Sequence, residues 1–379
     1  GIDLDALVAK RTAGMMQPKL AEQIAKRTRQ EFPEGIAAHG TDALRFTFLW
    51  LAATGRDIKF DLGRLEGNRN FCNKIWNAAR YVLMNAEGQD CAQDDGADYQ
   101  LSLADRWILS RLEQVTSEVG DLLTDYQLGE AAKRLYDFLW SEYCDWYIES
   151  TKVTLSGDDA AGGAAARQTL AYVLERSLRL LHPFMPFLTE ELWQRLPHAG
   201  DSIMVAPWPE AAENRVDTHA VREYDFLMDS VRAIRNARAE AGVEPARWIS
   251  AIIYPGSHSE TFATAEPVFR FLARVAEDRL EYRQSTGDAP GRAVTLVVDD
   301  AVIYLPLAGM VDLEGERERL RKEIGGVEAE IDRAGSLLGN ENFVRRAPEA
   351  VVAKHRERLA AAEERLALLR QRLRELSED

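Results

Sequence analysis

Residues 64–86 read RLEGNRNFCNKIWNAARYVLMNA, and this stretch decides what kind of body the chain builds. Its apolar residues recur at intervals that place them on one face of an α-helix. They are Phe71, Ile75, Trp76, Ala79 and Val82. A helix with one apolar face has to bury that face against other elements, so the stretch predicts a helix packed into a larger helical body.

The helical period continues on the C-terminal side of this stretch. It predicts further helices over residues 101–123, 128–152, 164–181, 189–196 and 218–240. We expect Thr189 to be the N-cap of its short helix. The aromatic residues of 128–152 follow core spacing, so we interpret them as packing residues and not as a base-stacking platform. The sequence therefore predicts a helical bundle over residues 64–245.

The segments on either side of the bundle differ from it. Residues 1–63 mix short helices with extended pieces and are too small for an independent domain. Residues 246–311 are predicted to form a small α/β domain, because 249–254 and 293–307 have strand character and 260–277 has helical character. We expect two strands within 293–307, on either side of Asp299-Asp300.

The C-terminal segment, 312–379, contains two series of apolar residues at alternating spacings of four and three. The first series is Leu320, Ile324, Val327, Ile331, Ala334 and Leu338, and the second is Val352, His355, Leu359, Ala362, Leu366, Leu369, Leu373 and Leu376. This heptad spacing predicts a coiled coil. The ten residues between them, 339–348, are enough for the chain to fold back, so we expect an antiparallel hairpin. The predicted fold class is therefore mainly α.

The composition indicates a soluble globular protein. Of the 379 residues, 46% are hydrophobic and 29% are charged. No apolar run has the length of a membrane span, so we expect no membrane association. The chain starts at Gly1 without an initiator Met or a signal-like segment, and we expect it to be a piece that begins within a longer protein.

The sequence offers no reaction centre. Cysteines 72, 91 and 144 are too far apart for a disulfide framework or a CxxC zinc site, which favours a reducing cytoplasm. The six histidines are scattered, so we expect no metal site. We find no supporting sequence context for three common kinds of catalytic site. These are a glycine loop that cradles phosphates, a nucleophile with its base, and a cleft with paired carboxylates, so no catalytic residue is predicted.

The polar face of residues 64–86 is the main candidate for function. Its members are Arg69, Asn70, Asn73, Lys74, Asn77, Arg80 and Tyr81. Recognition of an unstacked RNA loop needs amides for base edges, cations for phosphates and a ring for stacking, and this face has all three. The net charge of −15 argues against indiscriminate RNA binding, so the site would be a local patch. A merely solvated helix face is the alternative.

The hairpin tip is the second candidate. Basic residues gather there at Arg345, Arg346, Lys354 and Arg356, in a segment that otherwise carries both charge signs. Such a tip could rest on a nucleic-acid backbone, because phosphate contacts position a protein without reading sequence. A solvated coiled coil is the alternative interpretation.

Several motifs resemble the valyl-tRNA synthetases. They are HGTDALRF at 39–46, TGRDI at 54–58, RNFCNKIWNAAR at 69–80, DRWIL at 105–109, CDWYIE at 144–149 and HPFMPF at 182–187. Some of these are shared with the isoleucyl and leucyl relatives. The sequences NFV at 342–344 and APE at 347–349 are similar to the valyl-specific C-terminal coiled coil.

The resemblance implies a role. The bundle would hold the anticodon stem-loop of tRNA(Val), with Lys74 and Tyr81 at positions that contact anticodon nucleotides, and the C-terminal arm would brace the tRNA. Residues 1–63 would be the trailing, stem-contacting part of a catalytic domain. The whole enzyme would use ATP and Mg, but the HIGH and KMSKS motifs and the editing domain do not occur here, so this portion is expected to hold no cofactor.

The resemblance further implies a monomer in the cytoplasm, and two alternatives stay open. The first is the C-terminal region of an isoleucyl-type or leucyl-type synthetase, although the isoleucyl enzymes often bind zinc there and this chain has no clustered cysteines. The second is a non-enzymatic helical scaffold that binds proteins.

Overall fold

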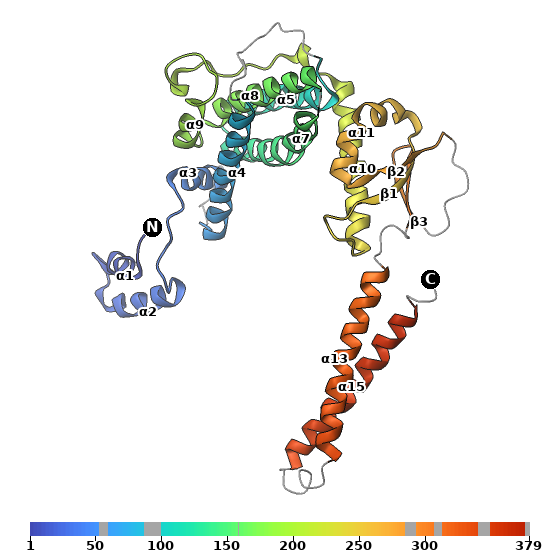
Figure 1. Cartoon of the computed structure of the whole chain (residues 1–379). Coiled ribbons are helices and arrows are strands. Elements are labelled where there is room, and N and C mark those ends of the chain that lie inside the picture. The colour runs from blue at the N-terminus through green and yellow to red at the C-terminus, as the bar shows by residue number, and fades with distance from the viewer. Residues whose placement is uncertain are drawn as a thin grey trace. The chain divides into compact units, whose positions relative to one another are not determined.

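The computed structural model describes residues 1–52, 60–86, 100–157, 159–284, 293–306, 313–339 and 349–375 (Figure 1). It is mostly helical with one small sheet, which confirms the predicted fold class. The chain divides into two compact units, each of which is described below by itself. Unit 1 contains residues 1–232, 255–273 and 298–301, and unit 2 contains residues 233–254, 274–297 and 302–379. The four-part division expected from the sequence remains a prediction.

Unit 1 begins with a pair of helices, α1 (Leu4–Thr12) and α2 (Ala21–Glu31), which lie side by side (Figure 1). A short 3₁₀ turn, η1 (Pro18–Leu20), precedes α2. The base of the pair is closed by an antiparallel bridge, in which Ile2 and Ile36 exchange two backbone hydrogen bonds of 2.8 Å. We call residues 1–36 the N-terminal hairpin.

The bundle follows the N-terminal hairpin in the chain. Its helices are α3 (Thr41–Leu51), α4 (Leu62–Ala86), α5 (Leu103–Thr124), α6 (Leu128–Asp137), α7 (Ile148–Ser156), α8 (Ala160–Leu181), α9 (Pro186–Trp193) and α10 (Thr218–Glu240). A π-helical segment, η2 (Phe138–Tyr147), joins α6 to α7. The core contains large side chains with no more than 1% exposure, among them Phe46, Phe71, Trp107, Tyr143 and Trp193. The helical bundle predicted from periodicity is confirmed.

The start of α9 differs from the prediction. The helix begins at Pro186, and Thr189 lies inside it as a fully buried residue. A proline suits the first turn of a helix, because its missing N–H would have had no partner there. The Thr189 hydroxyl bonds the Met185 carbonyl oxygen at 2.8 Å and lies 2.7 Å from Nδ1 of His182. Thr189 is therefore a buried hydrogen-bonding residue, and its expected role as N-cap is wrong.

Unit 2 contains a four-stranded sheet in the order β2-β1-β4-β3. Its strands are β1 (Ile249–Tyr254), β2 (Val275–Tyr282), β3 (Ala293–Val298) and β4 (Ala301–Pro306). Strand β1 is parallel to β2 and antiparallel to β4. The predicted strands over 249–254 and 293–307 are confirmed, and β2 was missed.

The helix between β1 and β2 is shorter than predicted. Beyond a 3₁₀ turn, η5 (Gly256–His258), helix α11 (Ser259–Ala273) ends four residues before the predicted end at 277. Arg274 has a φ of +58°, which takes the chain out of the helix. Strand β2 then lies at the edge of the sheet and carries several exposed charged side chains. Charges are common on edge strands, and here they hid the strand from its sequence pattern.

Two long helices, α13 (Leu313–Gly339) and α15 (Glu349–Glu375), form an antiparallel hairpin in unit 2 (Figure 1). The ion pairs Arg365–Glu323, at 2.6 Å, and Arg370–Glu328, at 2.7 Å, join them. Leu320, Ile324, Val327 and Ala362 are buried, as their heptad spacing predicted. We call the two helices α13 and α15 together the C-terminal arm. None of the helices in the described ranges is long and apolar enough to cross a membrane.

Candidate RNA-binding surface

Helix α4 presents two unlike faces, because one side packs into the bundle. Phe71, Ile75, Ala79 and Val82 are at most 1% exposed and hold the helix against its neighbours. Burying the side chains of Phe71, Ile75 and Val82 stabilises the fold by roughly 1.5–3 kcal/mol each, so the orientation of α4 about its axis is well fixed. The polar residues between these positions consequently face outward.

The structure exposes four of the seven predicted site residues on α4. They are Asn70, Asn73, Asn77 and Arg80. The intervals of three and four between them place them along one side of the helix, where their amides and guanidinium group are accessible to a ligand. Asparagine amides can both donate and accept hydrogen bonds, as base edges require. This arrangement agrees with an RNA-binding face.

Trp76 was predicted to lie on the buried apolar face of α4, and this prediction is wrong. Its side chain is 39% exposed, and the Arg195 guanidinium carbon lies 5.8 Å from the ring centroid. Trp76 follows Asn73 by three positions and precedes Arg80 by four, so the same helical spacing places it among the polar residues. That spacing was the signal that could have found it. The polar face of α4 therefore includes an aromatic ring with a cation beside it.

Lys74 lies at the edge of this face and is half-buried. Its ammonium group forms an ion pair with Asp145 and lies 4.3 Å from the ring centroid of Trp140. Trp140 in turn stacks on Tyr136, with 5.3 Å between the ring centroids. A cation over an indole face is stabilised by the ring's quadrupole. Lys74 is thus held in place by η2 instead of extending freely into solvent.

The two remaining predicted residues also have partners within the chain. The Tyr81 hydroxyl lies 3.3 Å from the Thr151 hydroxyl oxygen, and its ring is half-buried. Arg69 forms an ion pair of 3.5 Å with Glu66, one turn earlier on α4. The structure therefore brings the seven residues onto one helix, four of them exposed and three engaged at its edges.

The cysteines beside this face are suited to packing and not to chemistry. Burial raises the pKa of Cys72 to about 11 and that of Cys144 to about 12. Both therefore stay protonated near neutral pH, whereas a reactive cysteine needs a thiolate. Neither forms a disulfide within the described residues. Cys91 lies outside them.

The predicted site at the arm tip is only partly described. Arg356 is an exposed residue of α15. Arg345 and Arg346 lie outside the described residues, as does the side chain of Lys354. The assignment of these four residues to RNA binding stays a prediction.

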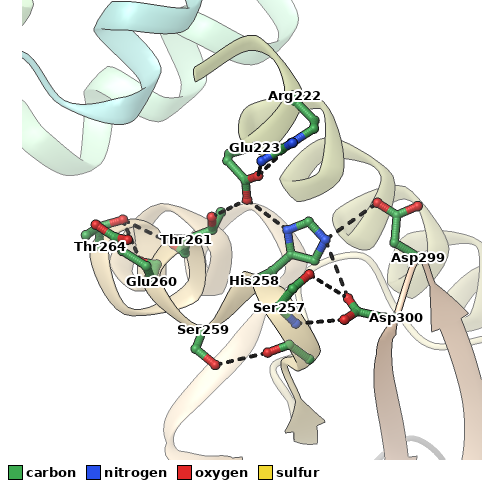
Figure 2. Close-up of polar contacts among 11 residues, drawn as sticks. Arg222, Glu223, Ser257, His258, Ser259, Glu260, Thr261, Thr264, Asp299 and Asp300 are labelled. Carbon is green, nitrogen blue, oxygen red and sulfur yellow. Dashed lines mark hydrogen bonds and ion pairs between the residues drawn. The ribbon is translucent and has the colours of Figure 1, made fainter. Parts of the chain in front are cut away.

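A polar cluster in unit 1 was missed by sequence reasoning (Figure 2). His258, on η5, bonds the Glu223 carboxylate of α10 through Nδ1 at 2.8 Å, and its ring stacks on Phe226 with centroids 3.6 Å apart. Its Nε2 lies 3.6 Å from Asp299 and 3.7 Å from Asp300. His258, Glu223, Asp299 and Asp300 line a pocket of about 700 Å³. They are far apart in sequence, which left no local signal for the cluster.

The hydrogen bonds of this cluster are directed at its carboxylates. Burial raises the pKa of Glu223, but hydrogen bonds from Thr261, His258 and Arg222 outweigh that effect and lower it to about 2. Asp300 accepts hydrogen bonds from the backbone N–H of Ser257, at 2.8 Å, and from its hydroxyl, at 3.1 Å. No set of three metal-ligating side chains occurs in the part of the chain that is described. The cluster is a clasp that holds η5 and α11 to α10.

Comparison with protein families gives two matches. Residues 105–253 match the model described as the anticodon-binding domain of tRNA ligase. Residues 312–377 match the model described as the valyl tRNA synthetase tRNA binding arm. The fold therefore defines a tRNA-binding class of protein, in which an anticodon-binding bundle is followed by a tRNA-binding arm.

Whole-sequence comparison narrows this class. The chain is 45% identical to the Valine–tRNA ligase of Xylella fastidiosa strain M23 over 395 aligned residues, and equally so to that of strain Temecula1. Each alignment covers 98% of this chain and 39% of the relative, so the chain spans about two fifths of their length. The chain belongs to the valyl-tRNA synthetase family and corresponds to its C-terminal, tRNA-binding portion.

Among solved structures, a LeuRS–tRNA–LeuAMS ternary complex from Agrobacterium radiobacter K84 shows a weaker likeness. It is 20% identical with a TM-score of 0.38, and the match covers 54% of this chain and 23% of that one.

Proposed function

We propose that α4 contacts the anticodon loop of tRNA(Val), and that the protein containing this chain uses ATP to attach valine to that tRNA. One observation carries the proposal for α4. Asn73, Asn77 and Arg80 are exposed around the half-exposed ring of Trp76. This is the set of groups that recognition of splayed-out bases requires, and a passive helix surface does not need it. The 45% identity to the Valine–tRNA ligases supports the choice of amino acid and tRNA.

The seven predicted residues of α4 would contact different parts of the RNA, according to their side-chain chemistry. The amides of Asn70, Asn73 and Asn77 would bond base edges, while Arg69, Lys74 and Arg80 would meet phosphates. The ring of Tyr81 would provide stacking, which contributes about 1–3 kcal/mol per base. The C-terminal arm would place Arg345, Arg346, Lys354 and Arg356 on the backbone of the same tRNA.

The remaining assignments follow from this role. Residues 1–63 would join a catalytic domain to the bundle, with 64–245, 246–311 and 312–379 as the anticodon-binding, linking and arm domains. Because tRNA charging supplies translation, the proposed location is the cytoplasm. We propose that the protein acts as a monomer, since the bundle and the arm of one chain provide both sets of tRNA contacts. A molar mass of a dimer in light scattering would refute this last point.

The test uses the full chain and two RNA probes. Filter binding compares a valine tRNA transcript with the same transcript carrying a changed anticodon, for the wild type and for Lys74→Ala/Tyr81→Ala. We expect the wild type to prefer the unchanged anticodon and the double variant to lose most of that preference. Lys133→Ala/Tyr126→Ala provides a matched control, because Tyr126 is exposed before α6 and the Lys133 ammonium group pairs with Glu130 at the surface of that helix.

Two results would contradict the proposal. If the double variant keeps the full preference for the anticodon, α4 does not read it. If the wild type binds valine tRNA no better than bulk RNA, the chain acts as a protein-binding scaffold. A better competitor among isoleucine or leucine tRNAs would reassign the tRNA.

A further inference from the structure

The contact between Arg195 and the Trp76 ring is part of a three-residue arrangement that joins α9 to α4. Arg195 also forms an ion pair with Glu191, one turn earlier. The side chains of Arg195 and Glu191 are 55% and 53% exposed, so both charged groups lie at the surface, as the half-exposed ring does. Helix α9 packs against α4, and the carboxylate, the guanidinium and the ring form a chain of contacts between the two helices. We call Glu191, Arg195 and Trp76 the Trp76 triad.

The C-terminal end of α9 gives the Arg195 cation a firm support. Leu192, Trp193 and Leu196 are at most 3% exposed, and the Trp193 indole N–H donates to the Glu175 carboxylate at 2.7 Å. The backbone N–H of Arg195 bonds the Leu192 carbonyl oxygen at 3.1 Å, in the turn that ends the helix. The position of the Arg195 backbone is therefore set by the packing of α9, and its side chain extends from a fixed point.

The N-terminal end of α9 is held by α3. The residue at the N-cap position, Met185, makes no side-chain hydrogen bond to the first turn, and the Asp42 carboxylate of α3 accepts the Leu188 backbone N–H at 2.6 Å. A carboxylate at this end of a helix also interacts favourably with the helix dipole. Arg45 of α3 donates to the Pro183 carbonyl oxygen at 3.2 Å. Both ends of α9 are therefore fixed within the bundle.

A second arginine of unit 1 makes the same kind of contact with a buried ring. Arg232 of α10 pairs with Asp229, one turn earlier, at 2.8 Å, and its guanidinium carbon lies 5.1 Å from the Trp146 ring centroid. Trp146 is 7% exposed, so its ring is closed to a ligand, whereas Trp76 is 39% exposed. The contact made by Arg195 therefore lies at an aromatic surface that a ligand can reach.

Lys74 and Trp76 flank the exposed row of α4 from opposite sides. They are two residues apart, which is about 200° around an α-helix. Each takes part in a contact between a cation, a ring and a carboxylate, because Lys74 contacts Trp140 and Asp145 while Trp76 belongs to its own triad. The exposed amides of α4 lie between these two groups. A loop that contacts the amides would meet the Trp76 ring on one side.

We propose that Arg195 is a positioning residue, which holds the Trp76 ring in the orientation in which a base of the anticodon loop stacks on it. This inference rests on the proposed function, which supplies the base. The quadrupole of an indole ring attracts a guanidinium group, and this attraction restricts the rotation of the ring. A ring that is already fixed loses less entropy when a ligand binds to it. Glu191 pairs with the guanidinium group and reduces its attraction for phosphates in general.

The first measurement follows the Trp76 ring itself. The full chain is labelled with 5-fluorotryptophan, and the fluorine resonance of Trp76 is assigned from its absence in Trp76→Phe. Arg195→Ala should shift or broaden this resonance, and Arg195→Lys should restore most of the wild-type signal, because an ammonium group also binds a ring face. Arg232→Ala is the matched control, which should affect the Trp146 resonance and leave that of Trp76 unchanged. An unchanged Trp76 resonance in Arg195→Ala would overturn the inference.

The second measurement is a double-mutant cycle, in which filter binding gives the affinity of the full chain for the valine tRNA transcript. Arg195→Ala should weaken binding about two- to fivefold, as expected for a cation–π contact between exposed groups. It should have no further effect once Trp76 is alanine, because effects that act through one contact are not additive. Arg232→Ala should bind as the wild type does. Circular dichroism verifies that each variant keeps its helices.

Two results of the cycle would contradict the inference while leaving the proposed function intact. If Arg195→Ala keeps the wild-type affinity, Arg195 does not support stacking on Trp76. If Arg195→Ala loses the same factor with and without the Trp76 ring, Arg195 contacts the RNA directly and is not a positioning residue. Failure of the proposed function is recognised in the wild type instead. Wild-type protein that binds valine tRNA no better than bulk RNA would refute both.

Discussion

The ammonium group of Lys74 lies 4.3 Å from the centroid of the Trp140 ring while it forms an ion pair with Asp145. Lys74 is the cation that family resemblance places at the anticodon, yet the chain already provides it with a carboxylate. The Lys74 side chain is 26% exposed and that of Asp145 is 49% exposed, so RNA can approach the pair. An RNA phosphate or base that binds there, as proposed, would have to compete with Asp145 for the cation. Such competition disfavours polyanions that offer no further contacts.

Replacing Asp145 by asparagine should therefore raise affinity and reduce selectivity. Asp145→Asn removes the competing charge and leaves Lys74 available to any phosphate. We expect binding to both the valine tRNA and bulk RNA to tighten by about two- to tenfold, with the larger gain for bulk RNA, in line with the modest strength of exposed ion pairs. Competition filter binding measures both. Glu149→Gln, which breaks the Lys152–Glu149 pair on α7, is the matched control. Unchanged selectivity would show that Asp145 does not restrain Lys74.

Trp76 offers a second test, because its exposure separates binding from stability. Trp76→Ala should cost about 1–3 kcal/mol of RNA binding if a base stacks on the ring, and Trp76→Phe should recover most of it. Urea unfolding should change little, since the side chain is 39% exposed. Trp107, which is fully buried, gives the contrast. Trp107→Ala should lower the free energy of unfolding by about 3–5 kcal/mol. A large loss of stability in Trp76→Ala would instead make Trp76 a packing residue.

Elements whose apolar residues recur at a regular spacing were predicted from the sequence. Elements that depend on contacts with distant parts of the chain were missed. The range of α10, 218–240, and the seam residue Leu320 were predicted correctly, because a repeated apolar spacing has one low-energy solution. Strand β2 was missed because an exposed edge strand needs few apolar residues. The cluster at His258 depends on its bond to Glu223, 35 positions away, which no local window contains.

The candidate site shows the same limit. Spacing placed Asn70, Asn73, Asn77 and Arg80 on the outer side of α4, and the structure exposes all four. Helical spacing could not show that Lys74 contacts Asp145, because Asp145 lies on η2, 71 positions further along the chain. Trp76 was wrongly predicted to be buried because of its residue type, since a tryptophan next to Ile75 suggests a core residue. Its position on the helix places it on the polar face instead.

Gly35 should be indispensable to the N-terminal hairpin. Its φ is +79°, and a Cβ atom there would lie 2.3 Å from the Ile2 carbonyl oxygen, against the backbone that closes the hairpin. Gly35→Ala therefore adds a steric clash to the cost of about 1–2 kcal/mol for a left-handed residue. Gly14→Ala is a matched control, because Gly14 has a φ of +63° but a Cβ atom there would meet nothing within 4 Å, so only the conformational cost applies. Hydrogen exchange at the Ile2 and Ile36 amides should accelerate much more in Gly35→Ala. Equal acceleration would exclude the clash.

The clasp around His258 should make unit 1 sensitive to acid. The pKa of Glu223 is about 2 in the folded chain, below its ordinary value of 4.5, because hydrogen bonds to the carboxylate outweigh its burial. A depressed folded pKa means that the carboxylate stabilises the fold fully above about pH 4.5, and that this contribution is lost as pH falls towards 2. Denaturant unfolding at about pH 6, 4.5 and 3 should show the wild type losing stability between the last two. Glu223→Gln should be less stable than the wild type near neutral pH but should lose less on acidification, because it cannot be protonated in that range. Glu260→Gln, in the same pocket, should retain the wild-type dependence. If Glu223→Gln shows the full wild-type acid dependence, another carboxylate causes it.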